Sequence, residues 1–316
     1  MSKSIDCVVC GTCVVDILVR PVSLEAPIGG NRLWHVEPLQ TAVGGLVSNT
    51  GTAMARLGQR VSAFSRVGND AWAAVLHDHF QREGIDSHGM IQHPGDVTGA
   101  TAVLIDSTGE RSFAHHIGAC AALSIDDFRA HHDLFRTARL VLVGYYSLLP
   151  ALEPDLAQLF AELKQLGCLT ALDAAGQGGG LEPLAGALPY LDYYVPSLNE
   201  ATNQTGETDP ERIVEVYRAH GATGMLGVKL GSKGAMLSPK PDEVLYVPCA
   251  APPGPVVDTT GAGDAFYGGL LAGMLRGFEP QQAAKLAATA AACCVTGYGA
   301  TAGLRNWDET ARLAGL

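Results

Sequence analysis

The 316-residue sequence lacks the features that mark nucleic-acid-binding, membrane-spanning and secreted proteins. Its 21 Lys and Arg residues are outnumbered by 32 Asp and Glu residues, the formal net charge is -11, and no dense Lys/Arg run interrupts this excess. Such a charge argues against nucleic acid as a partner. No apolar run approaches the roughly 20 residues of a membrane span, and the N-terminal stretch MSKSIDCVVC has no signal-length apolar segment. We therefore expect a cytoplasmic protein with no membrane partner.

Charge of either sign is sparse, and this excludes a disordered chain. Only 17% of the residues are charged, whereas 47% are hydrophobic. A globular chain of 32.9 kDa can bury a large core, either as one large α/β domain or as two smaller ones.

The eight cysteines do not form the ligand pattern of an iron–sulfur site. Three of them lie at three-residue spacing in CVVCGTCVVD, residues 7–16, but a ferredoxin-type run would need a fourth cysteine at position 17 followed by proline. The sequence has Ile17 and Leu18 there. In an apolar, β-branched strand, Cys7 and Cys10 point to opposite faces. We predict reduced, buried thiols, as is usual in the cytoplasm.

Short apolar runs alternate with amphipathic segments over most of the chain, a pattern typical of a doubly wound, mostly parallel sheet with flanking helices. Each helical segment is followed by a glycine, which adopts the left-handed conformation of a helix end at low cost. The predicted strands are 61–67, 140–143, 169–172, 193–195 and 225–230, and the predicted helices are 48–57, 70–83, 155–166 and 210–220.

Two segments, at about 12–43 and 97–117, have the alternating pattern of β-strands without intervening helices. Within the second, TAVLIDSTGERSFAHH has two alternating arms around the turn DSTGE, which predicts a hairpin. The pattern alone leaves two interpretations open, a flap over a binding site or a plain extension of the sheet edge. One of His115 and His116 should face the substrate side of such a flap.

The strongest chemical signal is DTTGAGDAFYGGLLAGMLRG, residues 258–277. A buried helix is predicted over 265–275, and Gly261, Ala262, Gly263 and Asp264 come just before it. Small residues let a phosphate approach the free N–H groups of a helix start, and a carboxylate there can accept the proton of an attacking hydroxyl. Asp264 has an equally simple explanation as a favourable charge at a helix N-terminus. The stretch is neither a Walker loop nor a complete dinucleotide fingerprint.

This stretch resembles the second signature of the ribokinase/PfkB family of carbohydrate and nucleoside kinases. The resemblance implies that Asp264 is the catalytic base, that the amides of Gly261, Ala262 and Gly263 form an anion hole, and that Asp258 and Thr260 bind a monovalent cation such as K⁺. It extends over nearly the whole chain and implies a single domain over residues 1–316, with a ribokinase-like α/β fold and a small β-sheet lid.

The segments GTCVVD and GGLVSNTGTAMARLG resemble the parts of the family that bind the acceptor. By this resemblance Asp16 holds substrate hydroxyls, and Gly44, Gly45 and Asn49 line the sugar-binding place. Leu46 stands where ribokinases commonly have lysine, which weakens the assignment to ribose more than the assignment to the family.

Two further segments, VPSLNEATNQTG and VKLGSKGAML, are similar to the family's nucleotide-binding parts. They imply that Glu200 acts through Mg²⁺ and its waters, while the nucleotide is bound at Ser197, Lys229, Gly231 and Gly234. A solvated lysine at the end of a strand is an equally good interpretation of Lys229 from the sequence. The loop VTGYGATAG, residues 295–303, resembles the one that closes over adenine and the cation, and Asp173 in LDAAGQ is a weaker candidate.

The resemblance implies an ATP-dependent kinase that phosphorylates a hydroxyl of a sugar or sugar-like molecule, with Mg²⁺ as cofactor. A nucleoside kinase is the alternative, and an aromatic, apolar pocket around Trp34 and the lid would favour it. Two other classes stay open, a non-catalytic sugar- or nucleotide-binding regulator and a nicotinamide-dependent oxidoreductase, which the missing fingerprint disfavours. Lid strands in this family often pair between subunits, so a homodimer through the lid is also open.

Overall fold

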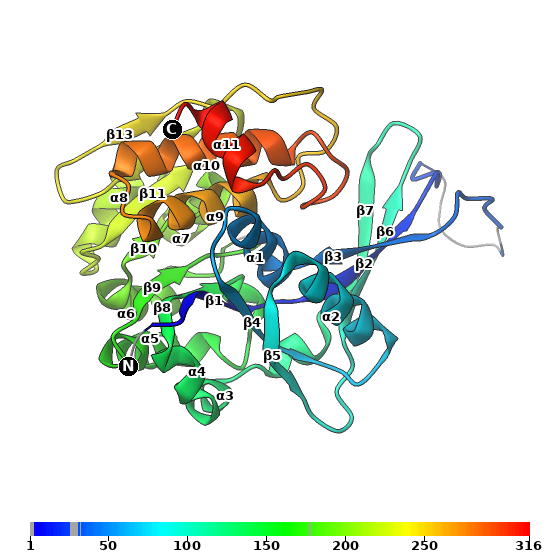
Figure 1. Cartoon of the computed structure of the whole chain (residues 1–316), viewed down its shortest axis with the longest axis horizontal. Helices are drawn as coiled ribbons and strands as arrows, with labels where there is room; N and C mark the ends of the chain where they lie inside the picture. Colours follow the sequence, from blue (N-terminus) through cyan, green and yellow to red (C-terminus); the bar gives the residue numbers. More distant parts are fainter. Residues whose placement is uncertain (1–2, 26–30, 32, 177) are drawn as a thin grey trace.

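The computed structural model describes residues 3–25, 31, 33–176 and 178–316. Residues 26–30 and 32 of the predicted lid segment, and residue 177 of the glycine-rich loop, lie outside the described part. The described chain forms two sheets with helices around the larger one (Figure 1).

The larger sheet has nine strands among the described residues, in the order β13-β12-β11-β10-β9-β8-β1-β4-β5. Neighbouring strands run parallel except at the β11–β12 and β12–β13 pairs. This confirms the predicted doubly wound, mostly parallel fold. The strands are β1 (Ile5–Gly11), β4 (Val61–Val67), β5 (Asp86–Gln92), β8 (Ala138–Gly144), β9 (Leu169–Leu172), β10 (Tyr193–Tyr194), β11 (Met225–Lys229), β12 (Ala235–Ser238) and β13 (Leu245–Val247).

Helices cover both faces of the sheet and end where the glycines predict (Figure 1). Gly58, Gly84, Gly167 and Gly221 all have positive φ angles, as helix-ending glycines do. The α-helices in the described chain are α1 (Leu46–Arg56), α2 (Ala71–Glu83), α3 (Ile125–Ala130), α4 (His132–Arg136), α5 (Leu156–Gln165), α6 (Leu181–Ala187), α7 (Leu198–Thr205), α8 (Pro210–Ala219), α9 (Ala262–Leu275), α10 (Pro280–Cys294) and α11 (Trp307–Ala314).

The smaller sheet is the lid, and its strands project from the body of the molecule (Figure 1). It consists of β2 (Val14–Val19), β3 (Gln40–Gly44), β6 (Gly99–Ile105) and β7 (Arg111–His116), in the order β3-β2-β6-β7. The predicted hairpin is β6–β7, with Ile105 opposite Arg111 beside its turn. Because these four strands pair with one another, the alternative of a plain extension of the large sheet is wrong.

Helix α9 begins three residues earlier than predicted. Gly261 is its N-cap with φ 75°, so Ala262, Gly263 and Asp264 form the first turn instead of preceding the helix. The reason is that the αL conformation of Gly261 starts the helix at once. The first amides of a helix have no intrahelical partner, and they point out of its N-terminal end beside Asp264.

The N-terminal cysteines lie in the core, as predicted. Cys7 and Cys10 are fully buried in β1, and Cys13 is fully buried just after it. Across the part of the chain that the structure describes, no three His, Cys, Asp or Glu side chains lie close enough together to hold a metal ion. A separate search of the same residues found no helix long and apolar enough to cross a membrane.

Candidate active site

The carboxylate of Asp264 lies at the start of α9, where helices α9 and α1 meet strand β8. The Asn49 amide on α1 donates to Asp264 Oδ2 at 2.8 Å. The Tyr145 hydroxyl, just after β8, donates to both carboxylate oxygens at 2.9 and 2.8 Å. Burial raises the pKa of Asp264, and the hydrogen bonds from Asn49 and Tyr145 partly oppose that effect. The site therefore holds a fixed carboxylate with proton affinity above the ordinary range.

Tyr145 is a site residue that the sequence did not indicate. Its backbone is in the left-handed region, with φ 58° and ψ 41°, which is uncommon for a residue with a bulky side chain. Such strain is tolerated where the surrounding structure enforces it, often at functional sites. The available signal was positional, because Tyr145 follows the carboxyl end of a predicted strand, the edge where α/β sheets bind ligands.

Lys229, at the end of β11, is not the solvated lysine of the alternative interpretation. Its Nζ lies 3.2 Å from Asp173 Oδ1, and the Lys229 side chain is only 13% exposed. A Cβ added to Gly263 would lie 3.6 Å from the same Nζ, so the ammonium faces the first turn of α9. Burial opposes this charge, but the carboxylates of Asp173, Glu200 and Asp264 outweigh it and raise the pKa of Lys229.

Asp173, the weaker candidate from the sequence, is the main partner of this lysine. It lies just after β9 and is almost fully buried. Burial raises the pKa of Asp173 to about 7, against the lowering effect of Lys229. The lysine therefore remains protonated and is one buried positive charge among several carboxylates.

The predicted nucleotide residues lie at the ends of the adjacent strands β10 and β11. Ser197 caps α7 in a capping box, in which the Ser197 amide donates to Glu200 Oε2 at 2.7 Å. Ser197 also forms an isolated bridge with Lys229. Gly231 and Gly234 bound the turn from β11 to β12 and have φ angles of 60° and 90°. The sequence thus brings these five residues to one edge of the sheet.

The predicted acceptor residues meet where the lid joins the large sheet. Asp16 on β2 has a raised pKa because of burial, which a hydrogen bond from Thr101 and the nearby His115 partly oppose. A Cβ on Gly44 would lie 2.6 Å from Asp16 Oδ2, so only glycine leaves room for that carboxylate. Gly45 caps α1 with φ 82°.

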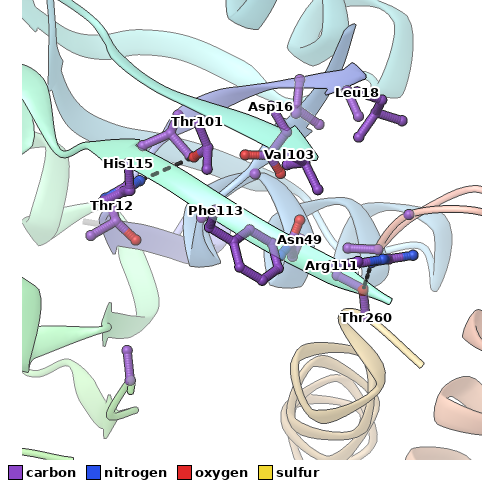
Figure 2. A pocket seen from close by; sticks show the side chains of 18 of the residues that line it. Thr12, Asp16, Leu18, Asn49, Thr101, Val103, Arg111, Phe113, His115 and Thr260 are labelled. Atoms are coloured by element: carbon purple, nitrogen blue, oxygen red, sulfur yellow. Dashed lines mark hydrogen bonds between the residues drawn. The ribbon is translucent and has the colours of Figure 1, made fainter. Parts of the chain in front are cut away.

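A cavity of about 570 Å³ lies between the lid and the large sheet. Asp16, Gly44, Gly45 and Asn49 line it together with Tyr145 and Glu200. His115, not His116, is the histidine that lines it, and its ring bonds to Thr101 (Figure 2). Asp264 itself does not line the cavity, but Asn49 and Tyr145, the two residues that donate hydrogen bonds to it, do.

The lid contributes an apolar wall to this cavity. Leu18, Val103 and Phe113 face inward from strands β2, β6 and β7 (Figure 2). Ile105, the last residue of β6, also lines the cavity. Phe113 is 62% exposed, so most of its ring is free to contact a ligand. Trp34, which the sequence offered as the aromatic part of the pocket, is not among the lining residues.

The two residues predicted to bind a monovalent cation, Asp258 and Thr260, lie just before α9. Both line the cavity, and both bond to Arg111 of the lid at 2.6 and 2.5 Å. This contact could not be predicted from the sequence, because Arg111 and Asp258 are 147 residues apart.

Comparison with known proteins agrees with this geometry. The pfkB family carbohydrate kinase model matches residues 4–307. A fructokinase from Klebsiella pneumoniae is 29% identical over 326 residues, 96% of this chain and 97% of that protein. A 2-dehydro-3-deoxygluconokinase from Bacillus subtilis is 27% identical over 266 residues, 79% of this chain and 80% of its own. The structure of Arabidopsis thaliana ribokinase complexed with ribose and ATP has a TM-score of 0.84 at 24% identity and covers 100% of both chains.

These matches confirm the ribokinase-like fold and the prediction of a phosphotransferase that acts on an alcohol group. They decide against the nicotinamide-dependent oxidoreductase. The family model covers more than nine-tenths of the sequence, and the matched range includes every segment that carries the resemblance. The chain therefore belongs to the pfkB family of carbohydrate kinases.

Proposed function

We propose that this protein transfers the γ-phosphate of ATP to a hydroxyl of a sugar or sugar-like molecule, with Asp264 as the general base. One observation carries the proposal. Asp264 is a buried carboxylate in the first turn of a helix, and its two donors, Asn49 and Tyr145, line the same cavity as Asp16. A hydroxyl bound at Asp16 and Asn49 would lie within one cavity with the base and the helix N-terminus.

The proton transfer follows from the hydrogen bonds of Asp264. A carboxylate has about four lone-pair positions, so the acceptor hydroxyl can donate a further hydrogen bond while Asn49 and Tyr145 keep theirs. As the new bond between the acceptor oxygen and phosphorus forms, the hydroxyl proton passes to Asp264, and the bond from the γ-phosphorus to the leaving ADP oxygen breaks.

The transferring group would be held by the start of α9 and by Lys229. The amides of Gly261, Ala262 and Gly263 would be donors for its equatorial oxygens, with the Ala262 amide turning from the Thr259 carbonyl, to which it donates at 3.3 Å, and the Lys229 ammonium would add a positive charge on the same side. Glu200 lines the cavity near them and would hold Mg²⁺ through its waters. When bound, Mg²⁺ supplies charge neutralisation between the phosphates.

The nucleotide would extend from this point across the turn at Gly231 and Gly234, next to Ser197. A second cavity of about 250 Å³ lies beyond that turn and has Val247, Cys249 and Ala288 in its wall. The Cys249 thiol donates to the Gly231 carbonyl at 3.3 Å, which joins the cavity to the turn. An apolar cleft of this kind suits the adenine ring.

We place the enzyme in the cytoplasm, where ATP is available, with residues 1–316 acting as one domain.

A nucleoside is the second candidate acceptor, and the apolar wall of the lid favours it. The cavity is polar at Asp16 and Asn49, where ribose hydroxyls would bind, and apolar at Leu18, Val103 and Phe113, where a base would stack. A free sugar would leave this wall in contact with water. Both acceptors use the same base and the same phosphate site.

The proposal is tested by an acceptor screen that follows ADP release, with pentoses, hexoses, sugar acids, a sugar phosphate and nucleosides side by side. We expect release that depends on one of these classes. A regulator without catalytic activity would bind ATP or a sugar and release no ADP with any of them.

With the accepted substrate, Asp264→Asn should lower kcat by about 10²–10⁴, the usual contribution of a general base. The affinity for ATP, measured by calorimetry, should change little, because the amide keeps the size of the carboxylate. Asp133→Asn is the matched control, since the Asp133 side chain is 86% exposed. Near-normal turnover in Asp264→Asn would remove Asp264 as the base.

A further inference from the structure

Arg111 crosses from the lid to the residues predicted to bind a monovalent cation. It lies at the first position of β7, and its guanidinium donates to Thr260 Oγ1 at 2.5 Å (Figure 2). The same guanidinium donates to Asp258 Oδ2 at 2.6 Å. The side chains of Arg111 and Asp258 are 25% and 4% exposed. The pair is therefore shielded from water, where an ion pair is stronger than on the surface.

The oxygens of Asp258 are already engaged. Oδ1 accepts from the Thr260 amide at 2.9 Å, and Oδ2 accepts from the Gly299 amide at 2.8 Å as well as from Arg111. The carboxylate therefore already has three donors, and one of them carries a positive charge.

Asp258 and Thr260 in this arrangement do not fit an inorganic cation. A second positive charge at Asp258 would lie beside the guanidinium and be repelled by it, with no unpaired charge to compensate. Thr260 Oγ1, the other predicted oxygen ligand, accepts from the same guanidinium. Arg111 therefore supplies what the cation would supply, a positive charge and bonds to both residues.

We propose that the Arg111 guanidinium takes the place of the predicted monovalent cation, so that phosphoryl transfer by this enzyme needs no K⁺. The inference rests on the proposed kinase function of this site. It assigns Arg111 a positioning role, because the guanidinium fixes the segment from Asp258 to Thr260, which leads directly into the anion-binding start of α9. The lid supplies the positive charge, since Arg111 belongs to the hairpin that also lines the acceptor cavity.

A second arginine of the lid, Arg20, contacts the loop at residues 295–303, whose Gly299 amide donates to Asp258. The Arg20 guanidinium lies over the Tyr298 ring, 5.3 Å from its centre, and Tyr298 precedes the Gly299 amide that donates to Asp258. The lid thus meets both segments that surround Asp258. Arg20 makes this contact without touching the Asp258 carboxylate, so it serves as a matched control.

The test is kinase activity as a function of KCl, with choline chloride keeping the ionic strength constant. The wild-type protein should show no response to KCl. Arg111→Ala should lose activity in choline chloride and recover it several-fold with KCl, because the vacated carboxylate then accepts K⁺. Arg111→Lys and Arg20→Ala should stay unresponsive to KCl, since each leaves a positive side chain at Asp258.

Thermal unfolding gives a second readout that needs no turnover. KCl should raise the Tm of Arg111→Ala above the choline chloride value and leave the wild-type Tm unchanged. This result would stand even if the acceptor screen found no kinase activity, so the two proposals fail separately. Activation of the wild-type enzyme by KCl would overturn the inference. A folded Arg111→Ala variant that keeps full activity or the wild-type Tm in choline chloride would also overturn it. So would a variant whose activity and Tm both fail to recover in KCl.

Discussion

At the scale of single residues, the proton affinity of Asp264 depends on groups from three parts of the chain. Burial raises the pKa of Asp264, whereas donors on Asn49 and Tyr145 and the charge on Lys229 lower it. As the general base that we propose, Asp264 would work in its deprotonated form, so activity should fall as the pH drops through this pKa. The acidic limb of the pH profile therefore reports directly on the hydrogen bonds of Asp264.

Tyr145→Phe should move that acidic limb of kcat/KM to higher pH. The substitution removes the hydroxyl that donates to both carboxylate oxygens of Asp264. Because this hydrogen bond lowers the pKa of Asp264, its loss should raise that pKa. The same loss leaves Asp264 held by fewer donors, so kcat at neutral pH should fall as well. The measurement is kcat/KM between acidic and neutral pH.

Tyr146→Phe is the control for this prediction. It is the adjacent tyrosine, but its hydroxyl donates to the Gly178 carbonyl at 2.7 Å. It should lower the Tm and leave the acidic limb unchanged. An unshifted limb in Tyr145→Phe would mean that the Tyr145 hydroxyl has no part in setting the proton affinity of the base.

The sequence could place Asp264 and Gly44 in the site, because each lies in a local motif with a known chemical meaning. It could not place Tyr145 and Arg111. Their partners are 119 and 147 residues away, and whether such side chains meet depends on the packing of the whole fold. The start of α9 differs from the prediction for a local reason, since the sequence does not show whether a glycine adopts the αL conformation that Gly261 has.

At the scale of elements, the close contact of α9 with α10 depends on glycine. A Cβ on Gly273 would lie 2.8 Å from both Cα and Cβ of Ala283, a distance that requires the helices to move apart. Gly51 in α1 has space instead, because a Cβ there would meet its nearest neighbour, Ile85 Cδ1, at 3.7 Å. Both glycines are inside helices, but only Gly51 has room for a Cβ. Substitution by alanine should therefore change the free energy of unfolding in opposite directions at the two positions.

Gly273→Ala should lower the free energy of unfolding by about 1–3 kcal/mol, the usual cost of overpacking. Gly51→Ala should raise it by about 0.5–1 kcal/mol, because alanine loses less conformational entropy in a helix. Urea unfolding of both variants and the wild-type protein measures the difference. Equal stability of the two variants would show that α9 and α10 adjust without strain.

At the scale of the whole molecule, the projecting lid leaves surface that the body does not cover. The accessible surface is 13743 Å², against about 12,500 Å² expected for a compact monomer of this mass. Because Leu18, Val103 and Phe113 face the cavity, strand alternation places their neighbours on the outer face of the lid. There Ile17 and Leu104 are half-buried and apolar.

We expect this outer face to pair with a second copy of the chain, an arrangement that the family resemblance leaves open. Light scattering after size exclusion should then give twice the monomer mass of 32.9 kDa. Leu104→Glu places a charge on the outer face and should yield monomers, since desolvating an unpaired charge disfavours association. Ser107→Glu, an exposed residue of the hairpin turn, should leave the dimer intact. A wild-type protein that runs as a monomer at all concentrations would contradict pairing through the lid, and the apolar residues of the outer face would then belong to the packing of the lid alone.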